Sequence, residues 1–100
     1  MTHASKPSRQ LDRYRKSIRV IVARHNAANA RVFGSVLHGD DAEGSDLDLL
    51  VDPAPSMTLM DIGAIRVELL DLLGVPVDVV TPEALPDSFR DQVLREAQPV

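Results

Sequence analysis

The chain has 100 residues, a net charge of −4 and 44% apolar residues, which suits one globular domain with a modest core. It has no cysteine, so disulfides, zinc–thiolate sites and thiol nucleophiles are excluded. The sequence contains no run of about 18 apolar residues and no signal-peptide core, so we expect a cytoplasmic protein with no membrane span.

Charge is distributed unevenly along the chain. Residues 1–31 carry eight of the eleven Lys and Arg residues and one of the fifteen acids. This pattern fits a basic face that binds nucleic acid or an acidic partner, but a solvated helix surface beside an acidic body is the favoured interpretation. Few aromatic residues lie among these bases to stack on nucleotides, so a nucleic-acid partner is not expected.

The N-terminal part is predicted to be a flexible segment, a helix and a strand. Residues 1–8 are polar and contain a proline, so the single domain is expected to span residues 9–100. Apolar residues at three- and four-residue spacing predict an amphipathic helix over 9–26, with Ser8 as its N-cap. A turn then leads into a first strand over 30–34.

Residues 35–39 are expected to form a turn or short helix, and residues 40–45 a loop. Asp40, Asp41 and Glu43 are taken as solvated loop residues. A second strand over 46–52 is apolar on both faces, as in a strand covered on both sides.

Thr58 and Asp61 have the spacing of a capping box, and the helix that they begin should end at Gly74 in a left-handed conformation. A third strand over 75–80 follows. Because a helix connects the second and third strands, these two strands are predicted to be parallel.

The C-terminal part is predicted to contain a short helical turn at 81–83 and a last helix over 87–96. Phe89 and Val93 are expected on the buried side of this helix. Together the elements predict an α/β (α+β) fold, with a mixed sheet of three or four strands and helices packed mainly on one face.

Two carboxylates and a glycine–serine turn suggest a nucleotide site. Asp46 and Asp48 are two residues apart on a strand, so they point to the same face and repel one another unless a cation lies between them. Mg²⁺ suits such oxygen ligands and keeps positions for phosphates. Gly34 permits close backbone approach and Ser35 can begin a helical turn that binds an anion, so this pattern predicts a nucleoside triphosphate site.

Asp78 interrupts a run of valines in the third strand. An acid within an apolar strand needs a polar partner or a metal, unless it faces water at the edge of the sheet. The residues alone leave both possibilities open.

The pattern Gly34-Ser35, ten residues, then Asp46-x-Asp48 resembles the DNA polymerase beta-like nucleotidyltransferase superfamily. Over roughly residues 10–100 the chain is similar to minimal nucleotidyltransferases (MNT), the MntA-type antitoxins of HEPN/MNT toxin–antitoxin systems. The resemblance implies that Asp78 is a third carboxylate beside Asp46 and Asp48. It also implies two Mg²⁺ ions and ATP as substrate.

The resemblance further implies catalytic and metal-binding roles for Asp46, Asp48 and Asp78, and nucleotide binding by Gly34, Ser35 and His38. Relatives usually carry Arg where this chain has His38, and His is only partly charged near neutral pH. Triphosphate affinity is therefore expected to be weaker and pH-dependent, unless His38 is a loop residue with no role.

The implied function is transfer of AMP from ATP to a tyrosine of a HEPN ribonuclease toxin from the neighbouring gene, with a hetero-oligomer as the working assembly. One alternative is an antitoxin that inhibits by binding alone. Another is a nucleotidyltransferase for small molecules such as aminoglycosides, although such relatives carry an extra helical domain.

Overall fold

The structure is a computed structural model that describes residues 6–100. In chain order its elements are α1 (Pro7–Arg24), β1 (Ala27–Phe33), β2 (Leu47–Pro53), α2 (Leu59–Leu73), β3 (Val77–Val80), the 3-10 helix η1 (Pro82–Ala84), α3 (Asp87–Glu96) and β4 (Gln98–Pro99).

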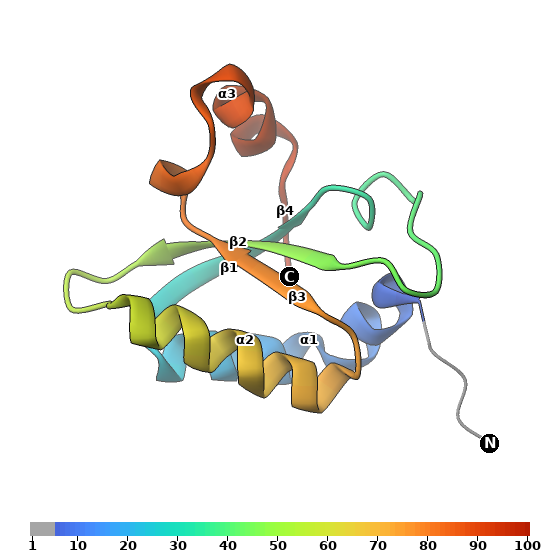
Figure 1. The fold of residues 1–100 in the computed structure, drawn as a ribbon, viewed down its shortest axis with the longest axis horizontal. Helices are drawn as coiled ribbons and strands as arrows, with labels where there is room; N and C mark the ends of the chain where they lie inside the picture. The colour runs from blue at the N-terminus through green and yellow to red at the C-terminus, as the bar shows by residue number, and fades with distance from the viewer. Residues whose placement is uncertain (1–5) are drawn as a thin grey trace.

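The strands form one mixed sheet in the order β3-β2-β1-β4 (Figure 1). β1 is antiparallel to both β2 and β4, whereas β2 and β3 are parallel. The predicted parallel pair is thus confirmed, since α2 provides the crossover that a parallel connection requires. The predicted fold class, a mixed sheet of up to four strands, is confirmed as well.

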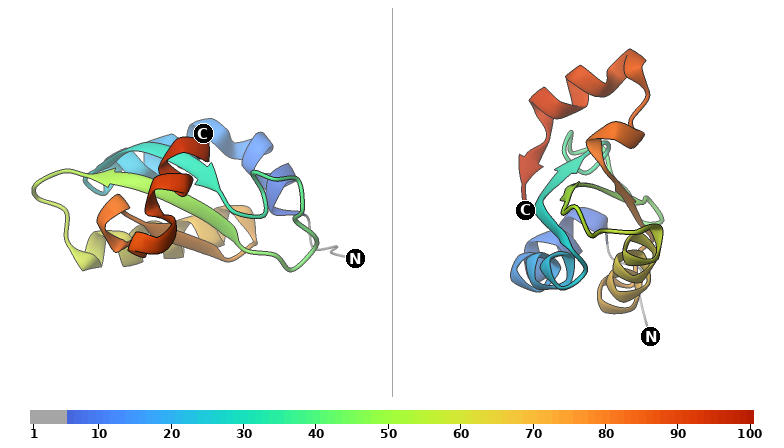
Figure 2. Two further views of the ribbon diagram at one scale, coloured as in Figure 1. Left: turned by 90° about the horizontal axis from the view of Figure 1, so that it is seen from above. Right: turned by 90° about the vertical axis from the view of Figure 1, so that its left-hand side faces the viewer.

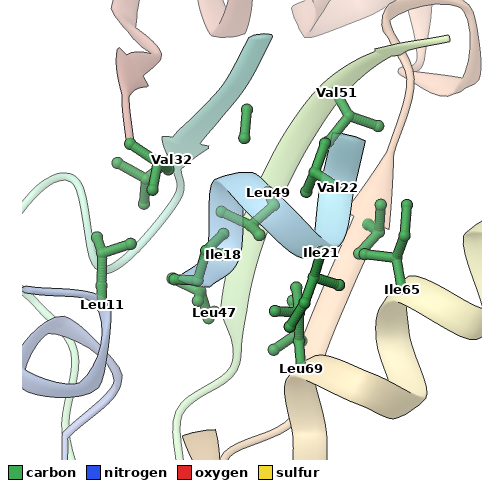
Figure 3. Packing of buried hydrophobic residues seen from close by; sticks show 14 of the residues in the cluster. Leu11, Ile18, Ile21, Val22, Val32, Leu47, Leu49, Val51, Ile65 and Leu69 are labelled. Atoms are coloured by element: carbon green, nitrogen blue, oxygen red, sulfur yellow. The ribbon is translucent and has the colours of Figure 1, made fainter. Parts of the chain in front are cut away.

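Alternation along β2 separates a core face from a second face, which carries Asp48, the completely buried Leu50 and Asp52. On the core face, Leu47, Leu49 and Val51 are completely buried in one cluster with residues of α1 and α2, with Leu47 and Leu49 beside Ile18 and Val51 beside Val22 (Figure 3). Burial of each such side chain contributes about 1.5–3 kcal/mol, so this layer stabilises the position of β2 strongly. α1 and α2 cover the same side of the sheet, as Figure 2 shows.

Within residues 6–100 neither these helices nor α3 has the length and apolar character needed to cross a membrane.

α1 begins earlier than predicted. Its first residue is Pro7, which is buried, and Lys6 is the N-cap, so the prediction that Ser8 caps the helix is wrong. Proline suits this position because its missing N–H would have no partner within the helix. Residues 7 and 8, expected in a flexible segment, are therefore helical, while residues 1–5 of that segment lie outside the described residues.

The cap of α1 comes from the loop after β1. The backbone N–H of Ser8 donates to Asp41 Oδ2 at 2.9 Å, and Asp41 is only 8% exposed. The assignment of Asp41 to a solvated loop is wrong, since this hydrogen bond satisfies a free N–H of the first helical turn. The same bond lowers the pKa of Asp41 below its ordinary value.

β1 also begins earlier than predicted, at Ala27, because α1 ends at Arg24 rather than at residue 26. A register shift between Ala28 and Arg31 places a bulge in the strand. Asn29 at the bulge has φ of +54°, a conformation that Asn tolerates better than most residues. Because of this bulge, the sequence of the segment resembles a turn, and the strand was predicted to begin only at residue 30.

The predicted ends of α2 are confirmed. The backbone N–H of Thr58 donates to Asp61 Oδ2 at 2.9 Å, the N–H of Asp61 donates to Thr58 Oγ1 at 3.4 Å, and Gly74 has φ of +71°. β3 starts at Val77, two residues later than predicted. Pro76 before it has no N–H for the ladder, although its carbonyl accepts from the N–H of Leu47 at 2.9 Å.

The bounds of α3 are those predicted, but its position is not. α3 has no buried residue, Phe89 is 42% exposed, and Val93 is only partly buried, so the expected burial of these two side chains is wrong. The reason is that α3 lies on the other side of the sheet from the core between α1, α2 and the strands (Figure 2). The short strand β4, which the sequence reading did not predict, pairs with β1 and ends the chain.

Candidate active site

Three acidic side chains lie on the open face of the sheet. Asp46 and Asp48 alternate with the buried residues of β2, so they point away from the core. Asp78 is directly beside Asp48 in the parallel register of β2 and β3. The two possibilities that the sequence left open for Asp78 therefore both hold. Asp78 is exposed to water on an edge strand, and it also lies beside Asp48.

The carboxylates influence one another electrostatically. The pKa of Asp48 is raised above its ordinary value, first by burial and then by the negative charges of Asp78 and Asp46. Within residues 6–100 no three acidic, histidine or cysteine side chains converge closely enough to hold a metal ion. The acids therefore share a face without gathering around one point, as repulsion between like charges dictates.

The chemistry of this donor set fits a magnesium ion. Carboxylate oxygens are the ligands that Mg²⁺ prefers, and a divalent cation would relieve the repulsion that raises the pKa of Asp48. The three carboxylates could hold such an ion if their side chains turned toward a common point.

The turn after β1 lies against Asp48. Gly34 has φ of +75°, and a Cβ built on it would lie 2.3 Å from Asp48 Oδ2. A larger residue would be strained at this positive φ and would displace the Asp48 carboxylate, so the glycine both permits the turn and brings its backbone next to the carboxylate. The N–H of His38 donates to the Gly34 carbonyl at 3.2 Å and that of Asp40 to the Ser35 carbonyl at 2.9 Å.

His38 contacts the C-terminal helix. Its Nε2 lies 3.3 Å from Glu96 Oε2 at the end of α3, and half of its side chain is exposed. His38, which is predicted to bind the nucleotide, thus lies at the end of the Gly34 turn, between the turn and α3.

A fourth acid on the same face is already neutralised. Asp52 accepts from Arg31 Nη2 at 2.5 Å through Oδ1 and from Asn29 Nδ2 at 2.9 Å through Oδ2. The sequence reading missed this pair, because alternation puts Arg31 and Asp52 on the same face of the sheet but only the register of β1 and β2 brings them together. Asp52 is therefore not available to a metal in the way that Asp46 and Asp78 are.

The acidic face is an open surface. A hollow of about 580 Å³ lies between α1 and α2 and is lined by residues such as Val20 and Leu72. It is on the other side of the sheet, and none of the predicted site residues lines it. An open acidic surface suits a large acceptor better than it suits an enclosed small molecule.

The chain is similar to several known proteins. It is 31% identical to an inferred protein adenylyltransferase of Methanocaldococcus jannaschii over 87% of this chain and 94% of that protein. It is 38% identical to the protein adenylyltransferase MntA of Thermococcus cleftensis over 65% of this chain and 66% of that one. Both similarities cover residues of the sheet and site described above.

Solved structures show the same architecture. One is the structure of a protein that is described as an inferred minimal nucleotidyltransferase. It superposes with a TM-score of 0.83 at 44% identity, covering 93% of this chain and 95% of the other. A toxin–antitoxin crystal structure with AMP-PNP shares the fold at 17% identity, with a TM-score of 0.68 over 93% and 71% of the two chains. The family model described as "Nucleotidyltransferase domain" matches residues 14–100, so this chain belongs to the nucleotidyltransferase domain family.

Proposed function

We propose that the protein is an antitoxin that transfers AMP from ATP to a tyrosine hydroxyl of a partner HEPN ribonuclease toxin and so neutralises it. The observation that carries the proposal is the position of Asp48, which lies beside Asp78 on one side and against the Gly34 turn on the other. The names of the relatives and the toxin–antitoxin origin of one structural neighbour support this choice of reaction and partner.

Asp46, Asp48 and Asp78 are the residues that would hold magnesium, with two ions as the resemblance implies. When bound, Mg²⁺ supplies positive charge that neutralises the triphosphate and the departing diphosphate. The protein's own contribution is mainly to position the reactants and to arrange charges around them.

The remaining residues bind and orient the reactants. The turn at Gly34 and Ser35 would hold the β- and γ-phosphates, with N–H groups of its first residues as donors. Asp78, exposed at the edge of the sheet, would lie nearest the acceptor hydroxyl and accept its proton. The hydroxyl oxygen then forms a bond to the α-phosphorus, the bond from that phosphorus to the bridging oxygen breaks, and diphosphate leaves.

A protein acceptor fits the open shape of this face. The toxin would present its tyrosine while the remainder of its surface stays outside, and the two chains would form a hetero-oligomer. Because ATP and a ribonuclease toxin are both expected in the cytoplasm, we infer that the protein acts there.

The test is transfer to the purified product of the neighbouring gene. After incubation with ATP and Mg²⁺, mass spectrometry should find the mass of one AMP on a tyrosine-containing peptide of that protein. Asp46→Ala and Asp48→Ala should abolish the transfer while remaining folded, whereas Asp71→Ala, which removes an exposed acid of α2 on the other side of the sheet, should retain it. Full transfer by either site variant would contradict the metal assignment.

One observation favours a second candidate, an antitoxin that inhibits by binding alone. His38 stands where the family resemblance implies Arg, and it contacts Glu96, so the turn has no fixed cation for the triphosphate. If the toxin is inhibited on mixing but acquires no AMP, this candidate replaces the first.

A further inference from the structure

The end of the chain forms an arch across the open face of the sheet. β3 lies at one edge of the sheet and β4 at the other, and η1 and α3 connect them on the side away from α1 and α2 (Figures 1 and 2). Asp48 and Asp78 lie on this side too, since the residues that alternate with them face the core. The arch is therefore a wall beside the acidic face.

Core packing does not hold α3 in place. The helix has 10 residues, none of them buried, and Leu94 is 38% exposed. Helices this short are marginal in water and usually depend on a packed apolar face. α3 must therefore keep its position through other contacts.

Arg90 provides these contacts at the β3 end of the arch. Its guanidinium donates to three backbone carbonyls and one carboxylate: Pro82 at 2.9 Å, Leu85 at 2.6 Å, Glu83 at 3.2 Å and Asp87 Oδ1 at 2.6 Å. The three carbonyls belong to η1 and the connection into α3, directly after the strand that carries Asp78. Only the planar fork of Arg can satisfy so many acceptors at once.

The other end of the arch is tied to the sheet and to the Gly34 turn. The backbone N–H of Val100 donates to the carbonyl of Ala30 at 2.9 Å, next to the β1–β4 pairing. Glu96 contacts His38 on the turn. With this end anchored, the angle at which α3 leaves β3 depends on the hydrogen bonds of Arg90, together with the burial of Leu85 in the same connection.

We propose that Arg90 is a positioning residue for the transfer reaction, which holds α3 as the wall against which the acceptor protein docks. This proposal rests on the proposed function. ATP is expected at the Gly34 turn and the carboxylates of β2, whereas the arch starts directly after Asp78, the acid expected nearest the acceptor hydroxyl. Loss of Arg90 should therefore weaken use of the acceptor and leave use of ATP unchanged.

The test compares Arg90→Met with Arg66→Met in the full chain. Arg66 is exposed on α2, on the other side of the sheet from α3, and among residues 6–100 its side chain makes no hydrogen bond or ion pair, so it controls for loss of one charge. Steady-state transfer is measured while the neighbouring gene's product and ATP are varied separately. Amide hydrogen exchange over residues 87–96 is measured on the same proteins.

Arg90→Met should raise the KM for the acceptor on the order of tenfold, because a docking surface loses its preorganisation, with an unchanged KM for ATP. It should also speed exchange in α3, and Arg66→Met should match the wild type in all readings. Arg90→Lys, which keeps the charge without the fork, should behave like Arg90→Met and serves if that variant does not fold.

Equal KM values for acceptor in the Arg90 and Arg66 variants, or a matching rise in the KM for ATP, would overturn the proposal. So would unchanged exchange in α3. If the wild type itself transfers no AMP, the proposed function fails first, and the exchange experiment still reports whether Arg90 holds the arch.

Discussion

Replacing Asp48 by Asn should stabilise the protein in the absence of divalent cations. Asp48 is partly buried and lies directly beside Asp78, so its charge costs free energy through desolvation and repulsion. Like charges directly opposite on a sheet destabilise by roughly 0.2–1 kcal/mol, and for a domain of this size that gain corresponds to a Tm increase of about 1–8 °C. Circular dichroism during heating in EDTA at pH 7 measures it.

The pH dependence of this gain follows from the direction of the shift. The pKa of Asp48 is higher in the folded than in the unfolded protein, so folding favours the protonated carboxyl. The cost is complete above the folded pKa, shrinks as the pH falls through it, and is absent below the unfolded value. The advantage of Asp48→Asn should therefore shrink as the medium is acidified.

Asp91→Asn is the matched control, because Asp91 is exposed on α3 and its side chain makes no hydrogen bond or ion pair within the described chain. It should leave the Tm almost unchanged at each pH. If Asp48→Asn lowers the Tm at pH 7 in EDTA, or raises it equally at every pH, the carboxylates do not interact as described.

Three further results are expected. Gly34→Ala should destabilise the protein by at least about 1–2 kcal/mol because of the positive φ, and the contact with Asp48 should increase this loss. Gly63→Ala, which has open space in a helix, should instead stabilise the protein by about 0.5–1 kcal/mol. Urea unfolding compares the two variants. Asp41→Ala should lower the free energy of unfolding by about 0.5–2 kcal/mol at pH 7, because the hydrogen bond from Ser8 is lost. This difference should disappear as the pH falls through the lowered pKa of Asp41, which urea unfolding at low pH measures. Mg²⁺ with AMP-PNP at about 100 times its Kd should raise stability by about 2.7 kcal/mol in the wild type and not in Asp46→Ala, as thermal shift would show.

Local sequence signals predicted the elements whose structure is decided locally. The capping box at Thr58, the glycine stop at Gly74 and the bounds of α3 depend on neighbouring residues, and all three agree with the structure. The start of α1 and the course of β1 depend on distant contacts. Asp41 caps a helix 33 residues before it, and the bulge at Asn29 resembles a turn until the pairing with β2 is known.

The candidate site was likewise predictable where it depends on local spacing or on the order of the strands, and not where it depends on distant contacts. The spacing of Asp46 and Asp48 determines that they share a face, and the parallel crossover brings Asp78 to the neighbouring strand. The pairing of Asp52 with Arg31 and the contact of His38 with Glu96 join residues 21 and 58 positions apart, and no local pattern encodes them. The side of the sheet on which α3 lies likewise depends on the whole topology, so Phe89 was misplaced.

The most direct test of the account is the location of a divalent cation in a crystal of the protein grown with Mn²⁺ and AMP-PNP. Anomalous scattering identifies the ion without reference to activity. The account predicts Mn²⁺ held by carboxylate oxygens of Asp46, Asp48 and Asp78, with the β- and γ-phosphates against the turn at Gly34. An ion that binds the nucleotide but none of these three carboxylates would contradict it.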